Sequence, residues 1–347
     1  MAAAQEMMSR HHQQEAGTTQ VGDLPEACLA QVLALTSPRD ASRCAAVSPA
    51  FRAVADSDDV WGAFLPRTSL LHDHRRVVVS LPQQQRQQAP PPAAKAAATT
   101  TSRSKKDAYL GLCDAGALVD GGRVRVWLQK ATGARCYALS ARRLSLPWDD
   151  GELSWRWTPH PLSRFPEVAE LVGCTGLDIY ARLPASALTP ATPYAAYLVY
   201  GTAAEGGHRG LSFPDQETAV AVGGRVVARH AVCLRPDDAE AREFRAVAAA
   251  AARGAGAEAQ PPAVRRPRVR EDGWWEVEMG RLDGTSTVAG DDGGDEAGED
   301  DRQQEEQVEV VASFEVLGWY PKRGLVVEAV EFRPAAPAVP HSSIREL

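Results

Sequence analysis

The stretch from residue 81 to residue 106 most constrains the fold, because it divides the sequence into two blocks. It holds a glutamine run at 83–85, a proline run at 90–92, several alanines and a threonine run at 99–101. Such a composition buries too little apolar surface to offset the entropy of ordering the chain. We therefore expect a linker over residues 67–106 and two folded domains, which suits a chain of 347 residues.

The block before the linker, residues 21–66, has the pattern of several short helices. Apolar residues from Cys28 to Leu33 recur at helical spacing after a Leu-Pro pair at 24–25. Ser37 and Ser48 each stand before a proline, which is typical of a cap followed by the first residue of a helix. A module this small makes a poor core by itself, so we expect it to need a partner.

The order and spacing of these residues resemble the F-box. The resemblance implies docking onto the Skp-type adaptor of an SCF ubiquitin ligase, and through it onto a cullin scaffold. The alternative is a helical hairpin that packs on the chain's own second domain. The residues that the resemblance assigns to adaptor binding are Leu24, Pro25, Val32, Leu33, Pro38, Val47, Phe51 and Trp61.

The second block, residues 107–334, has the pattern of an all-β domain. Apolar and polar residues alternate over 123–130, and Gly or Pro separates most later segments. We expect a helix over 165–171 and surface-loop insertions at about 236–270 and 283–307. Residues 1–20 and 335–347 are expected to be a disordered lead and a tail. The fold class predicted is α+β multidomain, a small all-α module followed by an all-β antiparallel sandwich. Further strands are expected at 177–182, 194–200, 218–222, 225–234, 274–279, 308–317 and 325–332.

Three of the eight tryptophans lie close together, at Trp148, Trp155 and Trp157. An Asp-Asp-Gly turn at 149–151 separates the first two, so we expect them to flank one turn. Flat rings beside carboxylates suit a sugar, whose C–H face stacks on the ring while its hydroxyls bond to the acids. Large aromatic residues are also common in cores, and the pattern leaves both interpretations open.

Several motifs of this block occur in the order found in the phloem protein 2 family of plants, whose tobacco-leaf member is a lectin. They lie at 141–148, 155–157, 167–171, 177–180, 194–200, 272–278 and 324–334. The resemblance implies a jelly-roll-like sandwich that binds N-acetylglucosamine oligomers or related glycans through Trp148 and Trp155. Ser154 and Gly176 stand where family members carry aromatic residues, so a sandwich that binds a protein target without sugar remains the alternative.

The sequence holds no nucleophile elbow, zinc-protease helix, phosphate loop or dinucleotide fingerprint, so we expect no catalytic residue, no cofactor and no metal. His72 and His74 form a pair without a third ligand. Glu276 and Glu278 are expected on the wet face of the sandwich rather than as a glycosidase pair. The arginine run at 265–270 is interpreted as a solvated loop rather than a nucleic-acid site.

The net charge of -7 arises from one tract, because residues 291–309 hold ten acidic residues and one arginine. The start of the chain lacks the pattern of a signal peptide, and no stretch has the length of a membrane span. We therefore expect a nuclear or cytoplasmic protein with no membrane partner. The function predicted is a substrate receptor whose sandwich recognises a glycoprotein or protein target. A lectin without a ligase role is the alternative.

Overall fold

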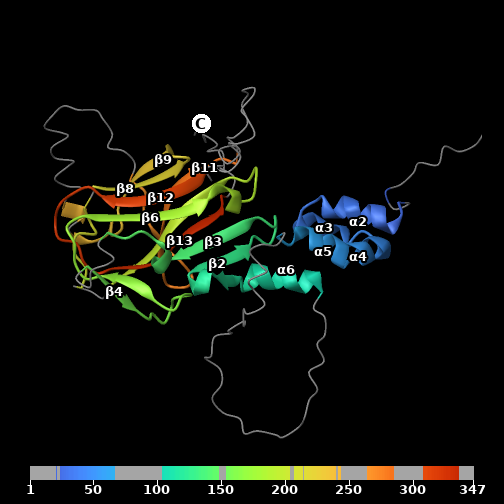
Figure 1. Ribbon diagram of the computed structural model, residues 1–347, viewed down its shortest axis with the longest axis horizontal. Coiled ribbons are helices and arrows are strands. Elements are labelled where there is room, and N and C mark those ends of the chain that lie inside the picture. The colour runs from blue at the N-terminus through green and yellow to red at the C-terminus, as the bar shows by residue number, and fades with distance from the viewer. Residues whose placement is uncertain are drawn as a thin grey trace, which may run out of the picture. The chain divides into compact units, whose positions relative to one another are not determined.

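The computed structural model describes residues 21, 24–66, 104–147, 154–203, 207–213, 215–239, 241–243, 264–284 and 308–335. Its Cα positions divide into two compact units (Figure 1). The helical unit contains the described residues up to 66 together with 104–110 and 130–133. The sandwich unit contains the others. Residues 107–110, which the sequence assigned to the β domain, therefore group with the helices.

Four short helices begin the helical unit, and two of them start at the serine caps that the sequence predicted. They are α2 (Glu26–Ala34), α3 (Pro38–Cys44), α4 (Pro49–Ala55) and α5 (Asp58–Phe64). The Ser37 hydroxyl accepts a hydrogen bond from the Asp40 N–H at 3.1 Å, and the Ser48 hydroxyl accepts one from the Phe51 N–H at 3.2 Å. Each cap stabilises its helix by about 1 kcal/mol.

Trp61 lies at the centre of an aromatic cluster in this unit. Its indole N–H donates to the Ala55 carbonyl at 2.7 Å. Its ring lies 5.7 Å from the Phe64 ring and 5.1 Å from that of Tyr109, which comes from α6 (Lys105–Asp114). The Lys105 N–H also donates to the Asp58 carboxylate at 2.8 Å. The beginning of α6 thus completes this core, although the sequence placed its first residues in the linker. The remaining core side chains are Leu29, Ala30, Leu33, Ala41, Val54, Ala55 and Val60.

The sandwich unit consists of two antiparallel sheets, which confirms the predicted fold class. The larger, nine-stranded sheet has the order β1-β2-β3-β13-β7-β11-β10, with β5 paired to β13 and β4 paired to β5, and the smaller has the order β6-β12-β8-β9. Figure 1 shows β6, β8, β9 and β12 together in one layer. The strands are β1 (Ala117–Val119), β2 (Val124–Leu128), β3 (Arg135–Ser140), β4 (Trp155–Thr158), β5 (Val168–Leu171), β6 (Leu177–Pro184), β7 (Tyr194–Thr202), β8 (Gln216–Val222), β9 (Arg225–Val232), β10 (Arg268–Val269), β11 (Trp275–Leu282), β12 (Glu309–Val316) and β13 (Leu325–Pro334).

Alternation along the strands fills the space between the sheets. On β6 the buried residues are Leu177, Ile179, Ala181 and Leu183, while the residues between them are partly or fully exposed. These side chains join one core cluster with residues of both sheets, such as Phe332 on β13. On strands such as β6, a pattern of period two therefore directs one face into the core of the sandwich.

Every strand predicted from alternation is present, with boundaries shifted by a few residues. The helix predicted over 165–171 is wrong, because Val168–Leu171 forms β5 and pairs with both β4 and β13. The predictions for residues 1–20, the linker from 67 to 103, most of both insertions and the tail from 336 onward lie outside the described residues. So do those for His72, His74 and Trp148.

Candidate functional site

The helical unit leaves several apolar side chains in solvent. The exposed fractions are 37% for Leu24, 46% for Val32, 88% for Leu35 and 68% for Val47, and Pro25 is also exposed. A module of this size has few apolar residues to form its core. Each of these exposed side chains could therefore gain free energy by being buried against a partner. They form a candidate docking surface, hereafter the exposed apolar set.

The eight residues predicted to bind an adaptor divide into two groups. Leu24, Pro25, Val32 and Val47 belong to the exposed apolar set, and Phe51 is half-buried. Leu33, Pro38 and Trp61 are buried, with Leu33 and Trp61 each 2% exposed. These three hold the unit together, and the direct contact predicted for them stays a prediction. Sequence reasoning did not assign Leu35 to adaptor binding, although it lies three residues after Val32, at helical spacing.

The predicted sugar-binding tryptophans do not form an exposed platform in the described residues. Trp155 is 3% exposed, belongs to the core cluster between the sheets and donates its indole N–H to the Pro147 carbonyl at 2.8 Å. The Arg142 guanidinium covers the Trp157 ring at 3.7 Å from its centroid. Trp148 lies outside the described residues. Trp155 therefore packs as the core alternative expects, and sugar binding stays a prediction.

A network of arginines and carboxylates covers the outer face of the larger sheet. Glu276, Glu328 and Glu331 are at most 2% exposed. Arg164 donates to both oxygens of Glu328, at 2.7 and 3.1 Å, and forms an ion pair with Glu331. Arg270 forms ion pairs with Glu276 at 3.0 Å and with Glu331 at 3.2 Å. Several arginines thus surround these carboxylates and compensate the cost of burying them.

A bulge in β13 explains how two of these carboxylates share one face. In a regular strand, residues three apart point to opposite faces. The register between β13 and β7 shifts between Val327 and Ala329, which leaves Glu328 as an extra residue. Glu328 and Glu331 can therefore both face Arg164. Sequence reasoning missed this network, although two glutamates within the apolar run at 325–332 were an available signal.

The electrostatics of the network are seen in Glu331. Burial alone would raise the pKa of its carboxyl group, but the charges of Arg164, Arg333 and Arg270 together outweigh burial. The pKa of Glu331 therefore lies below its ordinary value of 4.5. A cavity of about 510 Å³ borders the network and is lined by Arg268, Arg270, Glu276 and Arg333 among others.

Two predictions about charged residues in the sandwich are corrected by this network. Glu276 does not lie on a wet face, because it is 2% exposed and paired with arginines. The arginine run at 265–270 is solvated only in part, because Arg266 and Arg268 are exposed whereas Arg270 is mostly buried, and each of its arginines has an acidic partner. Arg265 pairs with Glu278, Arg266 with Asp237, and both Arg268 and Arg270 with Glu276. These arginines are neutralised within the fold and offer little free charge to a nucleic acid.

The part of the chain that the structure describes contains no group of three His, Cys, Asp or Glu side chains arranged to hold a metal ion. None of the helices described is long and apolar enough to cross a membrane.

Comparison with known proteins identifies both blocks of the chain. The F-box domain model matches residues 22–62, and the model described as phloem protein 2 matches residues 134–334. Similar proteins of Arabidopsis thaliana match along both. F-box protein PP2-B15 is 33% identical, over 90% of this chain and 96% of its own length. F-box protein VBF is 30% identical, over 90% of this chain and 98% of its own length.

Among solved structures, a family 35 carbohydrate-binding module from Clostridium thermocellum matches 58% of this chain and 98% of its own chain. The sequence identity is 9% and the TM-score is 0.28. At that TM-score the match bears on neither the fold nor the ligand of this chain.

Proposed function

Because the chain belongs to the F-box proteins that carry a phloem protein 2 domain, we propose that it is a substrate-receptor subunit of an SCF-type ubiquitin ligase. The helical unit binds a Skp-type adaptor and, through it, a cullin. The sandwich holds the target in the nucleus or cytoplasm. The observation that carries this proposal is the exposed apolar set, whose members Leu24, Pro25, Val32 and Val47 stand at F-box positions.

The exposed apolar set supplies a driving force for docking. Full burial of a side chain such as Val or Leu is worth about 1.5–3 kcal/mol relative to leaving it exposed. Leu24, Val32, Leu35 and Val47 together therefore offer several kcal/mol, part of which is lost to the entropy of association. An adaptor with an apolar groove would bury the side chains that the unit's own core of short helices leaves exposed.

The receptor acts by proximity and carries no catalytic residue in this proposal. Holding a target near a charged ubiquitin-conjugating enzyme raises the effective concentration of the target's lysines. The chemistry is left to other subunits.

The test of the proposal is co-purification of the full chain with a plant Skp-type adaptor. The variant Leu24→Ala/Pro25→Ala removes two exposed side chains from the start of α2 while leaving the core residue Leu33 in place. We expect the wild type to retain the adaptor and the variant to lose it. Failure of the wild-type chain to bind would favour a lectin without a ligase role.

The nature of the target is the finer part of the proposal. A glycoprotein bearing N-acetylglucosamine oligomers and a protein bound without sugar are the two candidates. A glycan array with wild type and Trp148→Ala separates them, because a lectin activity through that ring would be lost in the variant. Binding to no glycan at all would leave the protein target.

A further inference from the structure

Three loops at one end of the sandwich unit are held together by paired backbones. Cys174, after β5, exchanges two hydrogen bonds with Lys322, before β13, at 2.8 and 3.0 Å. Arg209, after β7, exchanges two with Arg323, both at 3.1 Å. A surface built from loops that are fixed in this way is preorganised for binding, since little entropy is lost when a ligand arrives.

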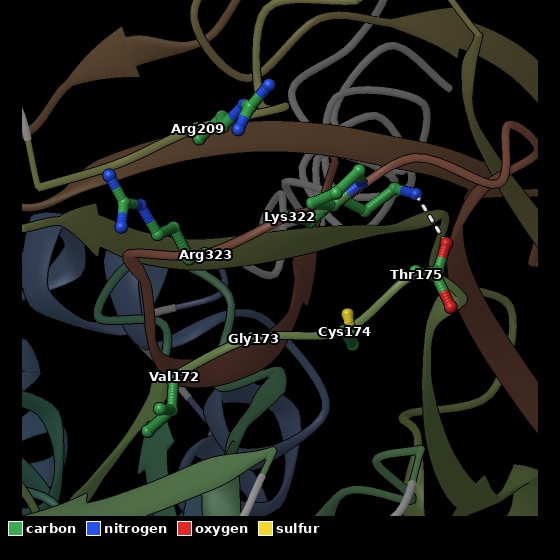
Figure 2. Close-up of a pocket in the computed structure, with 8 residues that line it drawn as sticks. Val172, Gly173, Cys174, Thr175, Arg209, Lys322 and Arg323 are labelled. Atoms are coloured by element: carbon green, nitrogen blue, oxygen red, sulfur yellow. Dashed lines mark hydrogen bonds between the residues drawn. The ribbon is translucent and has the colours of Figure 1, made fainter.

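These loops surround a cavity of about 470 Å³, a volume typical of ligand sites. Figure 2 shows the segment from Val172 to Thr175 on one side of it, with Arg209 and Arg323 on another. The cavity combines apolar lining from Val172 and Pro321 with the side chains of two arginines.

Lys322 places a buried positive charge beside the cavity. It is 1% exposed, and its ammonium group donates to the carbonyls of Thr175 at 2.7 Å, Gly318 at 2.5 Å and Tyr320 at 3.0 Å. In Figure 2 its side chain reaches toward Thr175. No carboxylate of the described residues forms an ion pair with this group, whose neighbours are these three carbonyls and the Tyr320 ring, with its centroid 3.9 Å from the ammonium nitrogen. Lys322 therefore fixes the loops and leaves the site positive.

Arg209 and Arg323 add two exposed charges of the same sign. They are directly opposite one another across an antiparallel bridge, which places both side chains on one face. Like charges in this position are destabilising. Within the described ranges, neither guanidinium has an acidic partner, whereas the arginines at 265–270 all have one. Among the residues that the structure describes, no anion relieves the repulsion of this pair.

Trp319 supplies an apolar surface in the same loop as Lys322. It is 84% exposed, and in the described part of the chain it is the one aromatic residue among the exposed large hydrophobic side chains. Its ring lies over Gly176, where a Cβ atom would be 4.0 Å from two of its carbons. Gly176 follows Thr175, which lines the cavity. Leu317, two residues before Trp319, is 59% exposed.

We propose that this cavity is a docking site for a peptide segment of the target, one that places an anionic side chain between Arg209 and Arg323 and an apolar side chain against Trp319. The positive charge calls for a carboxylate or a phosphate. The Trp319 ring would also suit a sugar, but Leu317 and Val172 add exposed aliphatic surface, which favours an apolar protein side chain. Only one part of this inference rests on the proposed function, namely that the bound protein is a ligase target.

The test measures peptide binding to the full chain without any adaptor, so its failure is distinct from failure of the F-box. The probes are fluorescent synthetic peptides that pair Glu, phosphoserine or Gln with a neighbouring Phe or Ser, read by anisotropy. We expect binding when an anion and Phe are both present, with the Glu and phosphoserine peptides deciding which anion is preferred. Adding salt weakens binding.

Variants locate the site on the chain. Arg209→Gln/Arg323→Gln and Trp319→Ala each change exposed side chains, so the fold is retained, as a thermal unfolding midpoint close to that of wild type would verify. We expect each to weaken binding about tenfold or more. Arg225→Gln is the matched control, because Arg225 is an exposed arginine of the sandwich without an ion pair in the described residues, and it should bind as wild type does.

The proposal is overturned by equal binding of the Gln and Glu peptides, by binding that survives the double arginine variant, or by no binding of any peptide. It is also overturned if the chain ignores the peptides but binds an oligogalacturonate in a manner that needs Arg209 and Arg323, because the ligand would then be an acidic sugar.

Discussion

Arg164 holds the carboxylate of Glu328 from 164 positions away in the sequence, donating to its two oxygens at 2.7 and 3.1 Å. Glu328 is fully buried and Arg164 is mostly so. The same guanidinium forms an ion pair with Glu331. The loop that carries Arg164 is thereby fastened to the bulged centre of β13.

Loss of Arg164 is expected to be strongly destabilising. Arg164→Met keeps the length of the side chain but leaves buried carboxylates with less compensation, at a cost of about 3–5 kcal/mol. Chemical denaturation of the sandwich measures this loss. The control is Arg182→Met, because the Arg182–Glu309 pair is about half exposed on both sides and is expected to contribute less than about 1 kcal/mol. Equal effects of the two substitutions would contradict the role of the network.

Stability is expected to fall in acid partly through Glu331. The pKa of this carboxyl is lower in the folded chain than its ordinary value of 4.5. A group of this kind contributes stability that is fully present above about pH 4.5 and is lost as the pH falls through the folded pKa. Glu331→Gln should therefore be less stable than wild type at pH 7, with a gap that narrows in acid. Glu309→Gln, at a half-exposed position, should change the stability at pH 7 only slightly.

Trp155→Ala is expected to destabilise the sandwich, so a loss of sugar binding in this variant would not identify Trp155 as a binding residue. A ring that is 3% exposed within the core leaves a large cavity when truncated, and such truncations cost about 3–5 kcal/mol. Thermal unfolding should show a much lower midpoint for Trp155→Ala than for Trp319→Ala, since the Trp319 ring is 84% exposed. Similar midpoints would contradict the core position of Trp155.

Neighbouring positions on α2 are expected to separate folding from docking. Leu33→Ala removes a side chain that is 2% exposed and should destabilise the helical unit by about 2–5 kcal/mol. Val32→Ala removes one that is 46% exposed and should change stability by about 0.5 kcal/mol or less. Circular dichroism during thermal unfolding measures both. A larger loss of stability for Val32→Ala than for Leu33→Ala would contradict the core position of Leu33.

Local chemistry made much of the fold predictable. The serine caps at 37 and 48 bond to the backbone three residues on, and alternating residues such as those of β6 dictate the sandwich faces. The segment at 165–171 failed because a short apolar run suits either a helix or a strand. Its pairing with β4 and β13 decides the outcome, and β13 is more than 150 positions away.

The sites were less predictable because their geometry depends on distant partners. The sequence gives no sign that β13 shifts register at Glu328, which alone brings two glutamates to one face. The sugar-binding prediction rested on the clustered tryptophans. Trp155 is buried, however, and among the described tryptophans the exposed one is Trp319. Which tryptophan reaches solvent depends on how loops pack, and periodicity does not encode this packing.

The measurement that tests the receptor account most directly is the affinity of the full chain for a plant Skp-type adaptor, compared between Val32→Asp and Val226→Asp. The two valines are 46% and 48% exposed, one on the helical unit and one on β9 of the sandwich, so the chemical change is matched. The account predicts tight binding by wild type and Val226→Asp, and a loss of about 100-fold or more for Val32→Asp, because a charge would be buried in the interface. Equal binding by both variants, or none by wild type, would contradict it.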